Sequence, residues 1–157
     1  MQMFVDRRTC RHTILRITTT SPTEFIDLTD QVSALIADRG LENGLVHVQT
    51  RHTTTAVVVN EHEPLLLADF AALLSSIAPR DADYRHDDMR TRTVNLAPGE
   101  RANGHAHCRA LLLGGSVMLN VAGGALQLGR WQRLFFVELD GAREREVSIL
   151  LLGDGLP

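Results

Sequence analysis

Three short segments of the chain concentrate the side chains that could do chemistry, at residues 51–55, 60–61 and 103–107. The first contains His52, followed by three threonines, between two segments that read as strands. Side chains at strand ends are held by a rigid scaffold and stay accessible, which suits a catalytic imidazole. The threonine hydroxyls either donate to a bound anion and orient the imidazole, or they satisfy a turn.

Glu61 is a second candidate, because it follows a β-branched run that we expect to be a buried strand. A carboxylate at the end of such a strand is unfavourable to bury unless it binds something. Glu61 could therefore ligate a metal, act as a general base, or begin a helix, where the dipole favours negative charge. We predict that Glu61 faces the histidines, whereas Glu63, before Pro64 at an exposed helix start, faces solvent.

The third segment reads as the start of a short helix over residues 105–113, with Asn103 as its N-cap. Residues two apart on a helix point in nearly opposite directions, so only one of His105 and His107 can face a shared site. In a strand, the two imidazoles would lie on one face instead. The apolar run ends at Gly114-Gly115, which suits a helix C-terminus.

Length and composition indicate one domain over residues 1–157, with 44% apolar residues to build its core. The charge of −3, without basic clusters, predicts no nucleic-acid partner. No apolar run reaches the roughly 18 residues of a membrane span, so no membrane association is expected. The N-terminal arginines lack the apolar segment of a secretory signal. Cys10 and Cys108 are expected to be free thiols in a reducing compartment, the cytoplasm.

Lysine is absent from the sequence, and arginine supplies all the permanently basic side chains. This absence excludes Schiff-base chemistry and a P-loop, since both need a lysine amine. Arginine can still bind a phosphate or a carboxylate through two parallel N–H groups. The candidate chemistry therefore concentrates in histidines, asparagines and acids between residues 52 and 107.

The elements that would position these groups are mostly strands. Residues 21–24 have the pattern of a helix N-terminus, and apolar residues follow at helical spacing until Gly40, which predicts a helix over residues 22–39. A second helix is predicted over residues 65–77. Strands are predicted at residues 9–18, 45–50, 55–59, 116–121, 130–139 and 145–152, with Asp140-Gly141 as the last turn. This order predicts an α+β fold with a β-sandwich or jelly-roll-like core, two main helices and a short third helix.

Residues 134–137 and 149–152 are apolar on both faces of their predicted strands. A two-layer sandwich has one inner face per sheet, so these strands need a second covering layer. The two main helices can supply that layer, and so can association of several copies of the chain. Trp131, beside the first apolar run, is predicted to pack structurally, whereas Gln132 on the opposite strand face is the better polar contact.

The polar segments together form an ordered set that is more specific than any one motif. The set is Arg51-His52-Thr53-Thr54, Asn60-Glu61, Asp69, His86-Asp87, Asn103-Gly104-His105-Ala106-His107, Gly129-Arg130-Trp131-Gln132 and Arg143-Glu144-Arg145. In this order the chain resembles the YjbQ family, over about residues 10–154. The resemblance implies a β-sandwich-like α+β fold and a homotrimer. It also implies a secondary thiamine-phosphate synthase activity, which joins a pyrimidine pyrophosphate to a thiazole phosphate and releases pyrophosphate.

The resemblance further implies a shared polar site. Its catalytic residues would be His52, Glu61, His86 and His107, with Gln132 and Arg145 as further binding residues. From the sequence itself we add Thr53, Thr54 and Asn103 as binding candidates. Three neutral imidazoles with one open position are the arrangement of a catalytic zinc site. We therefore expect His52, His86 and His107 to lie in contact range of one divalent metal, with zinc as the candidate, or of one anion.

Two classes of function stay open. An enzyme acting on phosphorylated small molecules, such as a thiamine-phosphate synthase, would use the imidazoles and Arg145 to bind phosphate. A metal- or ligand-binding protein without turnover, or a zinc-dependent hydrolase, would use the imidazoles to hold an ion. Mg²⁺ held by pyrophosphate prefers oxygen ligands, so a histidine cluster suits that ion poorly.

Overall fold

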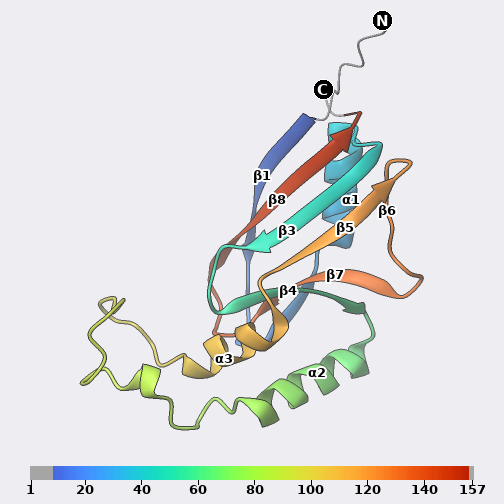
Figure 1. Cartoon of the computed structure of the whole chain (residues 1–157). Coiled ribbons are helices and arrows are strands. Elements are labelled where there is room, and N and C mark those ends of the chain that lie inside the picture. The colour runs from blue at the N-terminus through green and yellow to red at the C-terminus, as the bar shows by residue number, and fades with distance from the viewer. Residues whose placement is uncertain (1–8, 156–157) are drawn as a thin grey trace, which may run out of the picture.

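Two antiparallel sheets enclose the main core in the computed structural model, which describes residues 9–155. The larger sheet has the strand order β1 (Thr9–Thr18), β8 (Glu144–Asp154), β3 (Asn43–Thr50), β5 (Ser116–Ala122) and β6 (Ala125–Leu126). The smaller sheet has the order β2 (Glu24–Asp27), β7 (Gln132–Glu138) and β4 (Thr55–Glu61). Three helices, α1 (Thr29–Arg39), α2 (Pro64–Ile77) and α3 (Gly104–Leu113), complete the fold (Figure 1). The predicted α+β sandwich is confirmed.

Strand β7 is covered on both faces, as its apolar run predicts. Leu134 and Phe136 are buried in the core between the sheets, against which α1 also packs. Phe135 and Val137 point the other way and are buried in a second cluster with α2 and α3. These two helices lie on the side of the smaller sheet that faces away from the larger one (Figure 1). Helices of the same chain therefore supply the second layer over this strand.

The predicted helix over residues 22–39 is wrong in its first turns. Residues 24–27 form β2 at the edge of the smaller sheet, and the helix begins only at Thr29. The Glu24 carboxylate does not complete a helical capping box, because it accepts hydrogen bonds from the backbone N–H groups of Thr20 and Ser21. Phe25 instead packs against Phe135, with ring centroids 6.3 Å apart. Pairing with β7 thus outweighs the local helix signal.

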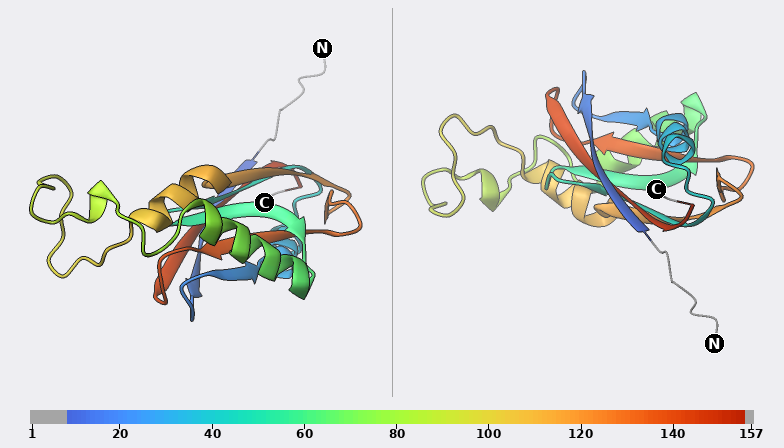
Figure 2. Two further views of the ribbon diagram at one scale, coloured as in Figure 1. Left: turned by 90° about the horizontal axis from the view of Figure 1, so that it is seen from below. Right: turned by 90° about the horizontal axis from the view of Figure 1, so that it is seen from above.

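A polar extension over residues 80–103 projects from the sheets and contains one 3₁₀ turn, η1 (Arg85–Asp87) (Figure 2). The side chain of Arg92 lies within this extension and holds its two arms together. Its guanidinium donates hydrogen bonds to the Glu100 carboxylate and to the carbonyl oxygens of His86, Val94 and Asn95. Because one half-buried cation joins both arms of the extension, this segment has a defined shape and can form the wall of a site.

In the part of the chain that the structure describes, no helix has the length and apolar character to cross a membrane. Cys10 and Cys108 are free and exposed.

Candidate functional site

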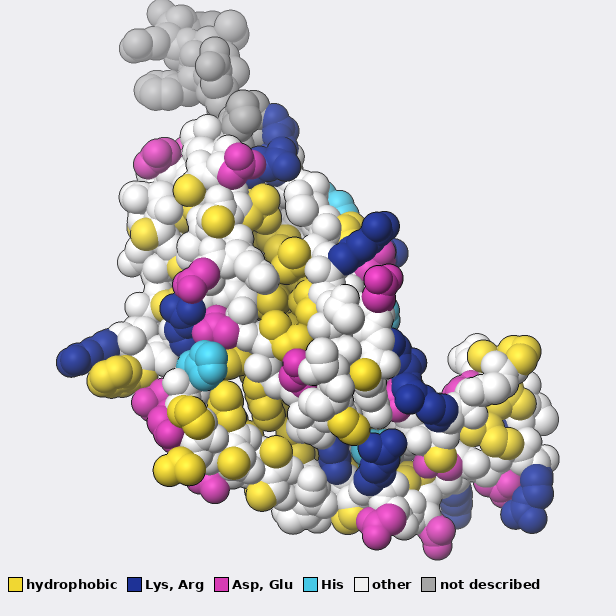
Figure 3. Space-filling view, turned by 180° about the vertical axis from the view of Figure 1, so that it is seen from behind, with side chains coloured by type: hydrophobic (Ala, Val, Ile, Leu, Met, Phe, Trp, Pro, Cys, Tyr) yellow, Lys and Arg dark blue, Asp and Glu magenta, His cyan; other side chains and the backbone are white. Residues whose placement is uncertain are grey.

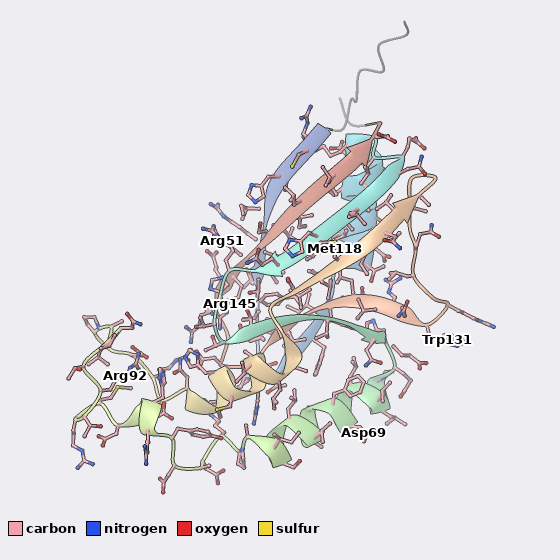
Figure 4. The ribbon with its side chains drawn as sticks, in the orientation of Figure 1. Arg51, Asp69, Arg92, Met118, Trp131 and Arg145 are labelled. Atoms are coloured by element: carbon pink, nitrogen blue, oxygen red, sulfur yellow. The ribbon has the colours of Figure 1, made fainter. Side chains whose placement is uncertain are left out.

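A cavity of about 850 Å³ lies where the β3–β4 turn, the extension, the start of α3 and the β7–β8 turn meet. We call it the histidine cavity. All the residues expected in the polar site line it except Glu61 and Gln132; they are His52, Thr53, Thr54, His86, Asn103, His107 and Arg145. Figure 4 shows Arg51 and Arg145 near the sheet ends on one side of this region and Arg92 in the extension on the other.

His52 is held in one orientation by the backbone of β8. The Glu146 N–H donates to its Nε2 atom at 2.8 Å, so the proton of the neutral ring resides on Nδ1. Burial lowers the pKa of His52, and the nearby Arg145 cation lowers it further. His52 is therefore a neutral imidazole with an Nδ1–H donor, and its Nε2 lone pair is already in use.

Arg145 is the buried cation of the cavity, with 3% of its side chain exposed. Its Nε and Nη2 atoms donate to the two carboxylate oxygens of Glu138 at 2.7 and 2.6 Å, and Nη2 also lies 3.2 Å from Thr54 Oγ1. Among the described residues, Nη1 donates no hydrogen bond. This arrangement leaves one end of a rigid fork unused in a residue that lines the cavity.

Glu138 fixes that fork from behind. Its fully buried carboxylate also accepts hydrogen bonds from the Thr19 hydroxyl and from the backbone N–H groups of Leu139, Asp140 and Gly141. Burial by itself raises the pKa of Glu138, but the hydrogen bonds from Arg145 and the backbone outweigh burial and hold this pKa below its ordinary value. Glu138 is therefore an anion throughout the neutral range, and Arg145 cannot swing away from it without leaving a buried charge unpaired.

His86 from η1 and His107 from α3 form a second cluster in the cavity, with ring centroids 4.5 Å apart. The His86 Nε2 atom is buried without a hydrogen-bond partner in the described structure, and it lies 3.7 Å from Glu100 Oε1. Burial lowers the pKa of His107, and the positive charge that His86 can carry lowers it further. Two imidazoles at this distance can exchange a proton with a ligand or hold one ion between them.

The α3 N-terminus is capped by a residue that the sequence did not indicate. Asn103 occupies the N-cap position as predicted, but its side chain makes no capping bond. The Asp87 carboxylate accepts from the backbone N–H groups of Asn103 and Gly104 instead, both at 2.9 Å. Tyr84 packs so closely here that a Cβ atom on Gly104 would lie 2.5 Å from the Tyr84 Cβ. This packing fixes η1, and with it His86, against α3.

His105 and His107 point apart on α3, in agreement with helical geometry. His107 lines the cavity, whereas His105 is buried beside Tyr84 at a ring-centroid distance of 6.5 Å. Burial lowers the pKa of His105, and the Arg109 cation lowers it further. His105 is thus a packed neutral residue outside the site.

Each cavity arginine has a carboxylate partner. Arg51 pairs with Glu146 and Arg92 with Glu100, whereas Arg101 and Arg143 share Asp140. No sequence pattern singles out Arg92, Glu100 or Arg101, and Asp140 is predicted only as part of a turn. Their one visible signal is a dense run of charges in a loop long enough to fold back over a site.

Glu61 and Gln132 lie at the opposite end of the smaller sheet. They face each other in the register of β4 and β7, about 20 Å along β4 from the Thr55 end that adjoins the histidine cavity. Gln132 Oε1 accepts a hydrogen bond from the Gly129 N–H. The prediction that Glu61 faces the histidines therefore fails within one chain, because the chain leaves the β3–β4 turn at one end of β4 and reaches Glu61 at the other. Glu63 caps α2 by accepting from Leu65 and Leu66 N–H groups.

Trp131 also lies at this second end, and its predicted packing in a strand is wrong. It precedes β7 and is 61% exposed, with the Arg130 guanidinium 4.6 Å from its ring centroid. Together with Glu61 it lines a second depression, of about 560 Å³, which we call the Trp131 cavity. Asp69, another member of the ordered set, is exposed on α2 (Figure 4).

The expected three-histidine metal centre does not form within one chain. Across residues 9–155, no three His, Cys, Asp or Glu side chains converge closely enough to hold a metal ion. The donor set explains this result, since His52 Nε2 accepts from Glu146 and only His86 and His107 are adjacent. The imidazoles therefore do not fit a complete zinc site in this arrangement.

Comparisons with known proteins agree with this architecture over nearly the whole chain. Residues 13–154 match the profile of the family described as UPF0047 protein YjbQ-like. A UPF0047 protein of Archaeoglobus fulgidus is 41% identical over 88% of this chain and 98% of its own length. One from Methanothermobacter thermautotrophicus is 37% identical over 88% of this chain and 90% of its own.

Solved structures give the same result. A YbjQ-like protein of Sulfolobus solfataricus P2 superposes with a TM-score of 0.84, at 30% identity, over 94% of this chain and all of its own. A protein of Aeropyrum pernix K1 has a TM-score of 0.81, at 34% identity, over 92% of this chain and 99% of its own. Sequence and fold together show that the chain belongs to the YjbQ (UPF0047) family.

Proposed function

We propose that the histidine cavity binds a phosphorylated small molecule and that the protein is a transferase of the thiamine-phosphate synthase type. The observation that carries this proposal is a pair of fixed donor residues at the sheet ends, both of which line the cavity. Arg145 presents Nη1 and His52 presents Nδ1–H, and both are locked by bonds to Glu138 and to β8. Donors that are already oriented can stabilise negative charge without reorganising when it develops.

The charges around the cavity also indicate that a phosphate would be recognised by oriented N–H donors and not by a simple basic patch. Five arginines surround the cavity, Arg51, Arg92, Arg101, Arg143 and Arg145, against the carboxylates of Glu100, Glu138, Asp140 and Glu146. Most of the positive charge is thus neutralised before a ligand arrives. A departing pyrophosphate would gain from N–H donors whose side chains are already held in place, which suits a displacement in which charge accumulates on the leaving group.

Binding and turnover can be tested separately. We expect pyrophosphate to bind in titration calorimetry, and Arg145→Lys to weaken it by about 10-fold or more, because lysine retains the charge beside Glu138 but loses the planar fork. Arg130→Lys, at the Trp131 cavity, is the matched control and should bind as the wild type does. Turnover is measured as thiamine phosphate formed from the pyrimidine pyrophosphate and the thiazole phosphate. Absence of pyrophosphate binding by the wild type would remove the proposal.

The second candidate is a metal- or ligand-binding protein without turnover, or a zinc-dependent hydrolase. The observation that favours it is the adjacent pair of His86 and His107, with His86 Nε2 buried and unpartnered in the described structure. Elemental analysis of the purified protein is the test. Stoichiometric zinc that disappears in His107→Gln would favour this candidate, and thiamine phosphate synthesis by the metal-stripped protein would favour the first.

The protein is also proposed to act in the cytoplasm as a homotrimer, with the cavity near a subunit boundary. Apolar side chains left exposed on one chain support association. Leu65, Leu73 and Ile77 of α2 are 75%, 56% and 55% exposed, and hydrophobic side chains gather over that end of the molecule (Figure 3). On the outer face of the larger sheet, Met118 and Leu152 are uncovered as well. Light scattering over a dilution series tests this, and a stable monomer with full activity would contradict it.

A further inference from the structure

The Asn103 side chain is a buried acceptor that no described residue satisfies. Only 9% of Asn103 is exposed, it lines the histidine cavity, and its Oδ1 atom has no hydrogen-bond partner. A buried polar group without a partner is destabilising, and in the wall of a cavity a bound water, ion or ligand can complete the bond. The Oδ1 atom can only accept a hydrogen bond, whereas an arginine can only donate. A ligand in the cavity that satisfies Oδ1 must therefore present a donor.

The amide orientation is set by its surroundings. The Asn103 Nδ2 atom donates to Asp140 Oδ2 at 3.5 Å. A flipped amide would place Oδ1 against that carboxylate, which is repulsive. The usual use of an N-cap oxygen is closed as well, because the capping role belongs to Asp87. The oxygen is thus kept away from both the helix N–H groups and the carboxylate.

The polar groups of the cavity therefore differ in kind from one side to the other. His52 Nδ1 and Arg145 Nη1 are donors and suit the oxygens of a phosphate. Asn103 Oδ1 is an acceptor and repels those oxygens. A simple anion such as pyrophosphate can satisfy the donors but leaves Asn103 unsatisfied, whereas a ligand with a phosphate and an N–H or O–H group satisfies both.

We propose that Asn103 is the specificity-determining residue of this cavity, and that its Oδ1 accepts a hydrogen bond from an amino or hydroxyl group on the same molecule that carries the phosphate. The proposal rests on the proposed phosphate binding at Arg145 and His52. It narrows the substrate class to phosphorylated molecules with such a donor. A site built around a buried acceptor rejects analogues that lack the donor, because binding them leaves the acceptor desolvated and unpaired.

The test uses the full chain and matched ligand pairs that differ by one donor. The pairs are 2-hydroxyethyl phosphate with ethyl phosphate, 3-hydroxypropyl phosphate with propyl phosphate, and adenosine 5′-monophosphate with purine riboside 5′-monophosphate; pyrophosphate is the donor-free reference. Dissociation constants are measured by titration calorimetry for the wild type, Asn103→Ala and Asn103→Ser. The serine variant retains an N-cap residue and removes the amide, which separates ligand effects from an effect on the start of α3.

In the wild type, we expect the donor-bearing member of at least one pair to bind about tenfold more tightly than its partner. Asn103→Ala and Asn103→Ser should abolish that ratio, and any change in pyrophosphate affinity should be much smaller than the change in the ratio. Three results would overturn the proposal: equal binding of both members in every pair, a ratio that survives both variants, or an equal loss of affinity for pyrophosphate. Failure of the wild type to bind pyrophosphate or any phosphate ester would instead remove the proposed function itself.

Discussion

The two ends of the smaller sheet show how differently one chain can hold its polar side chains. At the histidine cavity, Arg145 and Glu138 are buried and each has several partners. At the Trp131 cavity, Arg133 bridges Asp27 and Asp30, Asp30 is 85% exposed, and Trp131 projects into solvent. Buried pairs resist displacement, whereas exposed pairs rearrange at little cost. The first end is held rigidly by buried pairs, whereas the second end is accessible to solvent and can rearrange.

The largest expected effect is at the centre of the rigid end. Glu138→Gln removes the charge that Arg145 faces and leaves a buried cation unpaired, so unfolding in urea should show a loss of about 3–5 kcal/mol. The affinity for pyrophosphate should also fall if the Arg145 guanidinium loses its orientation. A loss below about 1 kcal/mol would mean that water reaches Arg145 and that the two ends are alike.

The next effect concerns the packing that places His86. Gly104→Ala puts a methyl group 2.5 Å from Tyr84 Cβ, where neither backbone can yield easily. We expect a loss of about 1–3 kcal/mol in the free energy of unfolding, as in other overpacked sites. Gly115→Ala is the matched control, because its nearest contact would be Thr50 Cγ2 at an ordinary 3.7 Å. Similar stability of the two variants would show that η1 is loosely held.

The two ends should lose stability over different ranges of pH. His52, His105 and His107 have pKa values lowered by burial, so the unfolded chain binds more protons than the folded one. Stability at the histidine end is therefore complete above the unfolded value near pH 6.5 and declines as the pH falls below it. At the other end, the pKa of Asp27 is lowered to about 2; burial opposes this shift, but hydrogen bonds from Thr29, Arg133 and His62 outweigh it.

Asp27 thus contributes stability above about pH 4 that is lost as the pH falls toward 2, on the order of 2 kcal/mol. Asp27→Asn should abolish the loss of stability between about pH 4 and pH 2. It should leave unchanged the loss that begins below about pH 6.5. The measurement is the free energy of unfolding by urea across the acid range. If Asp27→Asn instead alters the loss of stability that begins below about pH 6.5, the two ends titrate as one unit.

The smallest effect is expected at the exposed ion pair. Asp30→Asn breaks the 2.9 Å contact with Arg133 Nη2, but Asp30 is largely solvated. The free energy of unfolding should change by less than about 0.5 kcal/mol, and pyrophosphate binding should not change. A loss comparable to that of Glu138→Gln would erase the distinction between the ends.

Local patterns in the sequence predicted much of the fold and part of the site. The apolar run of β7, the start of α2 at Pro64 and the opposite directions of His105 and His107 follow from spacing alone. The family resemblance added His86, which no local pattern singles out. The structure brings His86 beside His107 through the Asp87 and Tyr84 contacts with α3, which sequence spacing does not reveal.

The failed predictions share a physical cause, which is that non-local pairing decided them. The segment around Glu24 has the pattern of a helix start, yet it pairs with β7 as an edge strand. Glu61 and His52 are close in sequence, but an extended strand between them holds them at opposite ends of the sheet. Arg92 and Glu100 define a wall of the cavity only because the extension folds on itself.

The position of β8 has a consequence for biosynthesis. This strand inserts between β1 and β3, pairing Thr9 with Gly153 and Gln49 with Ser148, so the larger sheet remains divided until β8 has been synthesised. The same strand carries Arg145 and the Glu146 N–H that orients His52. A chain that ends before β8 therefore has two open sheet edges, which invite aggregation, and lacks both Arg145 and the N–H group that orients His52. The five strands can form one sheet only after β8 has been synthesised, and chains that end before it are readily recognised by proteases.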